Sequence, residues 1–230
     1  MTVTGEKELA ERIDHTLLEA TAKKEQVKQL CREAIEFGFH AVCVNPRWVS
    51  LVADCLHNTK VNVGSVVSLP LGADTTKIKV AAAKEAIFAG ADEIDMVADL
   101  AAIIESDSGY LSSQFQAVLK VCRSMRPAVT LKVIIESAAL TCQQKAFACQ
   151  IADRCRVDFI KTSTGLHPAG GATVEDVKLM KETAPNCKIK AAGGIRTAKQ
   201  AIELLQAGAE RIGTSSGVQI INEFKETGMT

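Results

Sequence analysis

Short apolar segments alternate with helix-like segments along the whole chain, and this alternation constrains the fold more than any other feature. At Gly38, Gly90 and Gly208 a glycine ends a helix-like segment and a strand-like segment begins at once. Glycine suits the position beyond a helix C-terminus because it adopts the left-handed conformation without steric cost. Repeated strand–helix units of this kind predict a parallel sheet with helices packed against it.

Eight strand–helix units can be recognised in the 230 residues. Strands are expected at residues 13–17, 39–44, 61–68, 94–97, 129–136, 157–163, 187–191 and 210–213. Helices are expected at residues 21–38, 47–57, 74–90, 111–125, 141–154, 173–183, 197–207 and 215–224, with an Asp- and Ser-rich loop before residue 111. Eight units favour an α/β fold, a single-domain (β/α)8 TIM barrel with parallel strands over residues 1–230. A doubly wound open sheet is the alternative, but no GxGxxG motif follows the first clear strand.

Charge and cysteine content restrict the partners of the chain. Lys plus Arg and Asp plus Glu both number 27, so there is no broad electrostatic attraction to nucleic acid or to an anionic membrane. The eight cysteines form no CxxC pair, which suits reduced thiols in the cytoplasm. No apolar run approaches the roughly 18 residues of a membrane span, and His15, His40 and His57 lack zinc-ligand spacing. We therefore expect a cytoplasmic protein that acts on small molecules without a metal or another cofactor.

Four neighbouring strands each carry an ionisable residue inside an apolar segment. These residues are Asp95, Lys132, Lys161 and Lys190. A buried charge is costly unless it is paired or neutralised. Any one of the four could be a solvent-facing or salt-bridged residue, but together they indicate a site, because the working groups of such a barrel stand at the C-terminal ends of its strands.

The two central lysines suggest covalent chemistry. If Lys161 and Lys190 point into one barrel, their like charges disfavour double protonation, which leaves one amine neutral. A neutral amine attacks carbonyl groups and forms a Schiff base. Asp95 would supply the carboxylate that carries protons during carbinolamine dehydration and enamine protonation.

Two glycine-containing loops in the last quarter of the chain predict a phosphate site. Gly193-Gly194 follows the seventh expected strand, and Gly213–Gly217 follows the eighth and opens a helix. Glycine lets backbone N–H groups approach an anion, and a helix N-terminus adds free donors. Either loop alone could be ordinary turn chemistry with Ser as an N-cap. Both in consecutive loops favour phosphate, because barrels commonly bind it after strands seven and eight.

Seven motifs, in order along nearly the whole chain, resemble deoxyribose-phosphate aldolase. They lie at Asp14–Leu18, Ala41–Arg47, Glu93–Val97, Leu131–Glu136, Phe159–Gly165, Lys190–Thr197 and Gly213–Ser216. The resemblance implies a metal-independent class I aldolase, an aldehyde-lyase on a TIM barrel. Such an enzyme reversibly cleaves 2-deoxy-D-ribose 5-phosphate to D-glyceraldehyde 3-phosphate and acetaldehyde in deoxyribonucleoside catabolism. Small barrels often pair through their helical shell, so we expect a homo-oligomer, a dimer or a tetramer.

The resemblance also assigns roles to individual residues. Lys161 would be the Schiff-base nucleophile, Lys190 the second lysine that favours its neutral form, and Asp95 the proton donor and acceptor. The phosphate of the substrate would be bound by Gly165, Gly193, Gly194, Ser215 and Ser216. The rest of the substrate-binding site would be lined by Asp14, Thr16, Lys132 and Thr164.

Three stretches depart from the family pattern. The Asp95 strand continues with Ala98–Ala102 where an Asn and a Gly-containing loop are common, Ser137 replaces the usual Thr, and the chain ends at Thr230 without a terminal Tyr. These departures affect loop contacts and substrate binding. Two alternatives stay open: another barrel aldolase or lyase for phosphorylated sugars, such as one of the transaldolase kind, and a binding or regulatory barrel without turnover.

Overall fold

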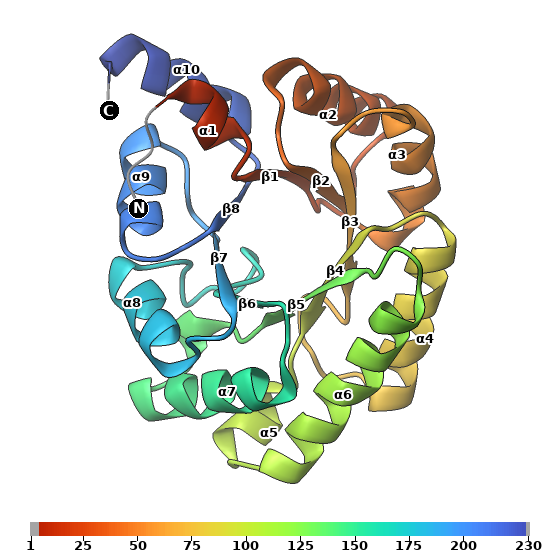
Figure 1. The fold of residues 1–230 in the computed structure, drawn as a ribbon, viewed down its shortest axis with the longest axis vertical. Coiled ribbons are helices and arrows are strands. Elements are labelled where there is room, and N and C mark those ends of the chain that lie inside the picture. Colours follow the sequence, from red (N-terminus) through yellow and green to blue (C-terminus); the bar gives the residue numbers. More distant parts are fainter. Residues whose placement is uncertain (1–4, 229–230) are drawn as a thin grey trace.

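Eight parallel strands close into a barrel in the computed structural model, which describes residues 5–228 (Figure 1). The strands are β1 (Ile13–Leu17), β2 (Ala41–Val44), β3 (Asn62–Val67), β4 (Glu93–Val97), β5 (Thr130–Ile134), β6 (Phe159–Lys161), β7 (Lys188–Ala192) and β8 (Arg211–Thr214). Each strand pairs with the next one along the chain, and β8 pairs with β1. The predicted (β/α)8 barrel is confirmed, and the open doubly wound alternative is wrong.

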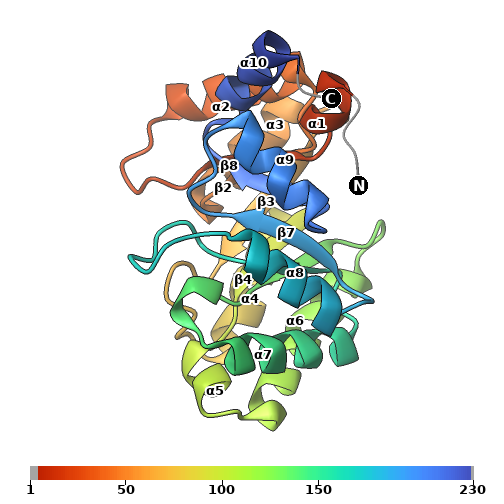
Figure 2. The same cartoon turned by 90° about the vertical axis from the view of Figure 1, so that its left-hand side faces the viewer.

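Helices surround the barrel on its outside (Figure 1). They are α1 (Glu6–Ala10), α2 (Lys24–Phe37), α3 (Val49–Leu56), α4 (Thr76–Phe88), α5 (Leu100–Ile104), α6 (Ser108–Ser124), α7 (Cys142–Cys155), α8 (Val174–Thr183), α9 (Ala198–Gln206) and α10 (Gly217–Thr227). Short 3-10 turns lie at Pro46–Trp48 and Ser137–Ala139. Figure 2 shows α1 and α10, from opposite ends of the chain, at the same end of the molecule, where they pack against each other.

Local sequence signals explain where several helices begin and end. Thr75, Thr141, Thr173 and Thr197 stand at the N-caps of α4, α7, α8 and α9, and each side-chain oxygen accepts a backbone N–H from the first turn. Such caps satisfy donors that have no partner within the helix. Gly38 ends α2 with φ 70°, as the glycine pattern predicts.

Alternate side chains of the strands separate the apolar core from the polar interior. Ile94, Ile160 and Ile212 are completely buried and belong to the large apolar cluster that also includes the inward residues of the helices. The residues next to them in sequence, such as Asp95 and Lys161, point the other way, into the barrel, because successive side chains of a strand alternate. The apolar core therefore lies between the barrel and its helices, and the charged residues lie inside the barrel.

The structure corrects four details of the predicted elements. Helix α1 was not expected, and α5 occupies part of the stretch that we expected to be a loop; the Asp99 side chain caps α5 by accepting the Ala102 N–H at 3.0 Å. Helix α2 begins at Lys24 rather than after Thr21, because the Gln26 side chain accepts the Lys23 N–H at 2.8 Å. Strand β6 covers only Phe159–Lys161, because the chain turns away into the loop that forms the site.

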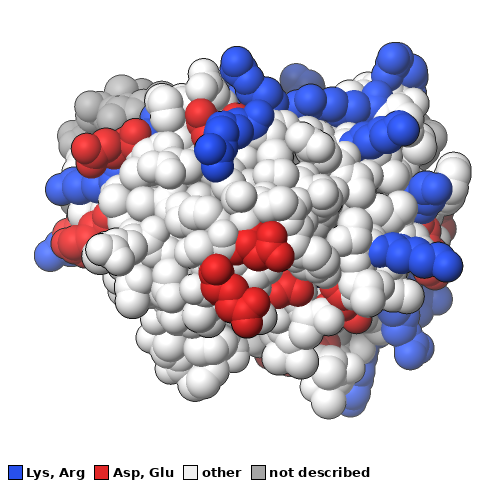
Figure 3. All heavy atoms as spheres, turned by 90° about the horizontal axis from the view of Figure 1, so that it is seen from below, with Lys and Arg blue, Asp and Glu red and all other residues white. Residues whose placement is uncertain are grey.

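The ends and the surface need only brief description. Met229 and Thr230 lie outside the described residues. No helix within residues 5–228 is long and apolar enough to cross a membrane. On the face shown in Figure 3, on the side of α5 in Figure 1, the centre is mostly uncharged apart from a compact acidic group, and Lys and Arg side chains lie toward the edges.

Candidate active site

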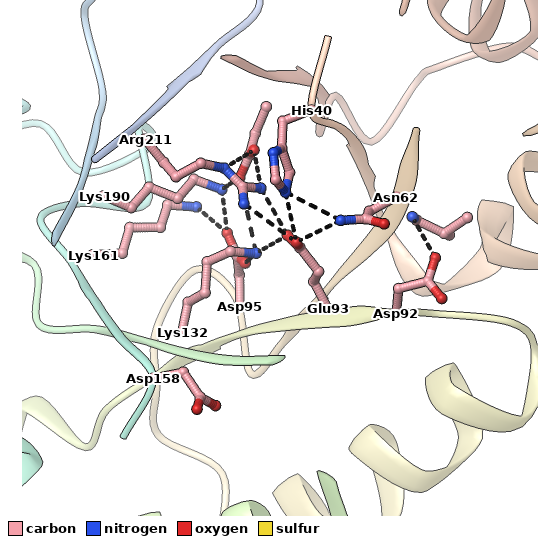
Figure 4. A network of polar contacts seen from close by, with 12 residues as sticks. His40, Asn62, Asp92, Glu93, Asp95, Lys132, Asp158, Lys161, Lys190 and Arg211 are labelled. Atoms are coloured by element: carbon pink, nitrogen blue, oxygen red, sulfur yellow. Dashed lines mark hydrogen bonds and ion pairs between the residues drawn. The ribbon is translucent and has the colours of Figure 1, made fainter. Parts of the chain in front are cut away.

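Asp95 lies at the centre of a cluster of lysines inside the barrel (Figure 4). Its Oδ2 accepts hydrogen bonds from Lys161 Nζ and from Lys190 Nζ, both at 2.8 Å. Its Oδ1 accepts one from Lys132 Nζ at 2.7 Å. Strand register produces this arrangement, because Asp95 pairs with Lys132 on β5 and Lys161 pairs with Lys190 on β7. The structure thus brings together the four ionisable residues that the sequence places on β4 to β7.

Asp14 joins this cluster from β1. Its Oδ2 lies 2.5 Å from Lys190 Nζ and 3.8 Å from Lys132 Nζ. Its Oδ1 accepts hydrogen bonds from the Arg211 guanidinium, including one from Nε at 2.7 Å. Glu93 completes the set, with Oε2 2.5 Å from Lys132 Nζ and 2.9 Å from Arg211 Nη2.

The cluster determines the charges of its members. Burial favours the neutral acid, but the ammonium groups around it hold the pKa of Asp95 well below its ordinary value. Burial also opposes a charged lysine, yet the carboxylates of Asp14 and Asp95 raise the pKa of Lys190 above its ordinary value. Despite burial, Lys132 and Arg211 likewise lower the pKa of Glu93 well below its ordinary value. Asp95 and Lys190 are therefore an anion and a cation at neutral pH.

This interior holds more basic than acidic groups among the described residues. The acids are Asp14, Glu93 and Asp95, and the bases are Lys132, Lys161, Lys190 and Arg211. Uncompensated charge in a water-poor interior is unfavourable. The charges balance when one lysine is an uncharged amine, which is the nucleophilic form.

A cavity of about 260 Å³ lies at the C-terminal ends of the strands, next to Lys161. Its lining includes seven of the residues predicted from the sequence: Thr16, Lys161, Thr164, Gly165, Gly193, Gly194 and Ser215. The other interior groups, Asp95 and Lys190 among them, are buried and do not line it. Lys161 therefore connects the charged cluster to the cavity.

Glycines allow two loops to meet at the edge of this cavity. Gly165, Gly193 and Gly194 have φ angles of 82°, 95° and 76°, a region that other residues adopt only with strain. A Cβ atom on Gly193 would lie 2.9 Å from the Gly171 Cα, so the loops after β6 and β7 pack backbone to backbone. Exposed backbone at such a place can bind an anion.

Ser216 lies apart from this cavity. It lines a neighbouring groove between α2 and α10, and its N–H donates to Thr214 Oγ1 at 2.9 Å. Ser215 lines both the groove and the cavity. The two serines therefore occupy different positions, although the sequence suggested one role for both.

Several residues at the site were not predicted. Glu93 and Arg211 belong to the interior cluster, and the period of two would have identified them, because they stand two residues before Asp95 and Gly213. Arg196, just beyond the Gly193-Gly194 pair, lines the cavity and adds a positive charge there. Within residues 5–228, no group of three or more His, Cys, Asp or Glu side chains is arranged to hold a metal ion.

Comparison with known proteins identifies the family of this barrel. The family model described as DeoC/LacD family aldolase matches residues 9–223. A deoxyribose-phosphate aldolase of Thermococcus kodakarensis is 49% identical over 220 residues, which cover 94% of this chain and 97% of that protein. One from Thermoanaerobacter is 44% identical over 223 residues, covering 96% of this chain and 99% of that protein.

A solved structure shows the same fold. The tetrameric deoxyribose phosphate aldolase from Aeropyrum pernix superposes with a TM-score of 0.89 at 30% identity, covering 97% of this chain and 93% of that chain. The range that the family model matches, residues 9–223, covers nearly the whole sequence, and the interior cluster lies within it. This chain therefore belongs to the DeoC/LacD family of aldolases.

Proposed function

We propose that this aldolase reversibly cleaves 2-deoxy-D-ribose 5-phosphate to D-glyceraldehyde 3-phosphate and acetaldehyde through a Schiff base on Lys161. One observation carries the proposal: Lys161 lines the cavity while its Nζ shares Asp95 Oδ2 with Lys190 Nζ. The relatives are named deoxyribose-phosphate aldolase, which supports this substrate.

The reaction begins with attack of the Lys161 amine on the C1 aldehyde of the open-chain sugar. Loss of water from the carbinolamine gives a protonated imine, which draws electrons from the C2–C3 bond as the C3 hydroxyl loses its proton. Cleavage releases D-glyceraldehyde 3-phosphate and leaves an enamine on Lys161. Protonation of the enamine at C2 and hydrolysis of the imine then release acetaldehyde.

Asp95 and Lys190 have separate tasks in this scheme. Asp95 is within hydrogen-bond distance of the reacting nitrogen and transfers protons at the dehydration and enamine steps, directly or through water. Lys190 stays cationic between two carboxylates, so its charge disfavours a second ammonium at Lys161. Asp14 and Lys132 contact these groups rather than the cavity, and we propose that they maintain the charge arrangement.

The far end of the cavity would bind the phosphate. Gly165, Gly193, Gly194 and Ser215 offer backbone there, and Arg196 offers a guanidinium. Thr16 and Thr164 line the space between the phosphate end and Lys161, while Ser216 supports the loop after β8. A cavity of about 260 Å³ suits a small substrate such as a five-carbon sugar phosphate.

We further propose that the protein works in the cytoplasm without a metal and as a homo-oligomer, a dimer or a tetramer. The eight cysteines, all within residues 5–228, are free thiols, which suits a reducing compartment.

The Aeropyrum pernix relative is a tetramer. Leu71, Ile78 and Phe88 expose apolar side chains on and beside α4, with Phe88 79% exposed. Light scattering of the wild type and of Phe88→Asp tests the assembly, and a monomeric wild type would contradict it.

Borohydride trapping tests the covalent mechanism. The protein is incubated with 2-deoxyribose 5-phosphate or acetaldehyde, reduced, digested and analysed by mass spectrometry, and the products are identified separately. We expect the reduced adduct on Lys161 and none in Lys161→Ala, whereas Lys188→Ala, which removes a lysine at the far end of β7, behaves like the wild type. An adduct on another residue, or turnover by Lys161→Ala, would contradict the proposal.

A further inference from the structure

Glu136 combines two unfavourable features just beyond the end of β5. Its side chain is completely buried, and its backbone has φ 53° and ψ 58°, the left-handed region that non-glycine residues seldom occupy. Burial of a carboxylate and a left-handed backbone both cost free energy. Residues of this kind persist where the surrounding structure requires them, and they concentrate near functional sites.

The Glu136 carboxylate is directed at the loop that follows Lys161. Both of its oxygens accept the backbone N–H of Thr164, Oε1 at 3.2 Å and Oε2 at 3.3 Å. Among the described residues, the Thr164 N–H is the one hydrogen-bond donor to the Glu136 carboxylate. Thr164 lines the cavity and precedes Gly165, at the end of the cavity where we place the phosphate.

The backbone on each side of Glu136 is tied to the same loop. The Ile135 N–H donates to the Lys161 carbonyl at 3.1 Å, and the Ser137 N–H donates to the Thr162 carbonyl at 2.8 Å. The left-handed turn at Glu136 lies between these two bonds and lets its side chain reach one step further along the loop. Three successive residues after β5 thus hold the segment from Lys161 to Thr164.

The reacting nitrogen is held differently. Lys161 Nζ lies 2.8 Å from Asp95 Oδ2 on β4, whereas the Glu136 carboxylate accepts the backbone N–H of Thr164. A change at Glu136 can therefore move the phosphate-binding loop without disturbing the ion pair at the amine.

We propose that Glu136 is a positioning residue that sets the phosphate-binding loop at its working distance from Lys161. The inference rests on the proposed function, and it adds a residue for which no substrate contact is needed. Glu136 affects how tightly the phosphorylated end of the substrate binds and leaves imine formation at Lys161 unaffected.

The test compares a phosphorylated with an unphosphorylated substrate. In Glu136→Met, which keeps the volume and removes the acceptor, we expect KM for 2-deoxyribose 5-phosphate to rise about tenfold, roughly the effect of one lost hydrogen bond to a charged group. We expect KM for 2-deoxyribose and the rate of acetaldehyde trapping to stay within about twofold of the wild type. Inorganic phosphate binding, measured by calorimetry, should weaken in parallel.

Asp158 provides a matched control. Its Oδ2 accepts the Leu131 N–H at 2.9 Å, so a carboxylate ties the same two strands together at the opposite end of the barrel, away from the charged cluster (Figure 4). Asp158→Ala should lower the melting temperature and leave the ratio of the two KM values unchanged. Equal losses on both substrates in Glu136→Met, or an unchanged ratio, would overturn the proposal.

Two further substitutions of Glu136 keep the proposal testable if Glu136→Met does not fold. Glu136→Gln retains an oxygen at the same reach and should restore the wild-type ratio, whereas Glu136→Asp withdraws the carboxylate and should raise KM for the phosphorylated substrate alone. Identical ratios for these two variants would refute the role. Failure of the wild type to cleave 2-deoxyribose 5-phosphate would instead refute the proposed function, and the calorimetric comparison would still decide the role of Glu136.

Discussion

Lys79 is a second kind of buried lysine, outside the active site, and it makes the stability of the protein depend on pH. Its side chain on α4 is completely buried. Nζ donates to the carbonyl of Val97, at the end of β4, at 2.8 Å and to Gln114 Oε1 at 3.0 Å. Neither partner carries a charge, so burial lowers the pKa of Lys79 to about 8, although Asp99 and Asp74 oppose the change.

The size and the sign of the effect follow from this pKa. The folded protein binds the Lys79 proton with a pKa of about 8, against 10.5 for an unperturbed lysine. Between these values the unfolded chain holds more protons, so the free energy of unfolding rises with pH. Below pH 8 the folded state carries the full cost of the buried charge, about 3 kcal/mol, and about 2.5 kcal/mol of it is relieved between pH 7 and pH 10.

Urea unfolding of three proteins at pH 7 and pH 10, followed by circular dichroism, measures this contribution. Lys84→Met removes an exposed lysine from the same helix and should change with pH like the wild type. Lys79→Met lacks the titrating amine. From pH 7 to pH 10 its free energy of unfolding should therefore rise by about 2.5 kcal/mol less than that of the wild type. The same pH response in Lys79→Met and Lys84→Met would refute the lowered pKa of Lys79.

Four further predictions concern the site. Asp95→Asn leaves three lysines without their shared carboxylate, so turnover should fall by about a hundredfold or more and the free energy of unfolding by roughly 3 kcal/mol, as measured by product formation and urea unfolding. Lys190→Leu should fold and form the imine slowly at pH 7 in borohydride trapping; wild-type kinetics would contradict the pairing of the lysines. Gly193→Ala forces a Cβ to 2.9 Å from the Gly171 Cα at φ 95°, so KM for the phosphorylated substrate should rise about tenfold in steady-state assays. Asp95 and Glu93 have lowered pKa values, so their stabilisation is complete above about pH 4.5 and is lost as pH falls through the folded values, which acid unfolding with Asp95→Asn as control would reveal.

The fold could be predicted because the signals for it are local and repeated. Each βα unit has its own apolar strand and its own helix, some of the helices end at a glycine such as Gly38, and eight such units leave few arrangements. The start of α2 was wrong for a local reason as well: Thr21 is a good N-cap residue, but Gln26 caps the chain at Lys23. Helix α5 was missed because its five residues are too few to show a helical period.

The candidate site could be located from the sequence to the extent that its residues interrupt apolar strands. Asp95, Lys132, Lys161 and Lys190 stand out because buried strands seldom contain charges. Glu93 and Arg211 stand at strand starts, next to Asp92 and Glu210, where a charge looks like an exposed strand end. The period of two places them on the same strand face as Asp95 and Gly213, but their burial depends on the closed barrel and on partners far away in sequence.

The interior cluster explains why the site requires a complete barrel rather than a few sequence motifs. Lys190 is cationic because Asp14 on β1 and Asp95 on β4 face it, and Asp14 is held in turn by Arg211 on β8. Strands from opposite parts of the chain therefore contribute to the charge at one amine. A substitution at Arg211 should consequently alter imine formation at Lys161 although Arg211 does not line the cavity, because the unpaired Asp14 carboxylate would bind Lys190 more strongly and reduce the charge that Lys161 senses.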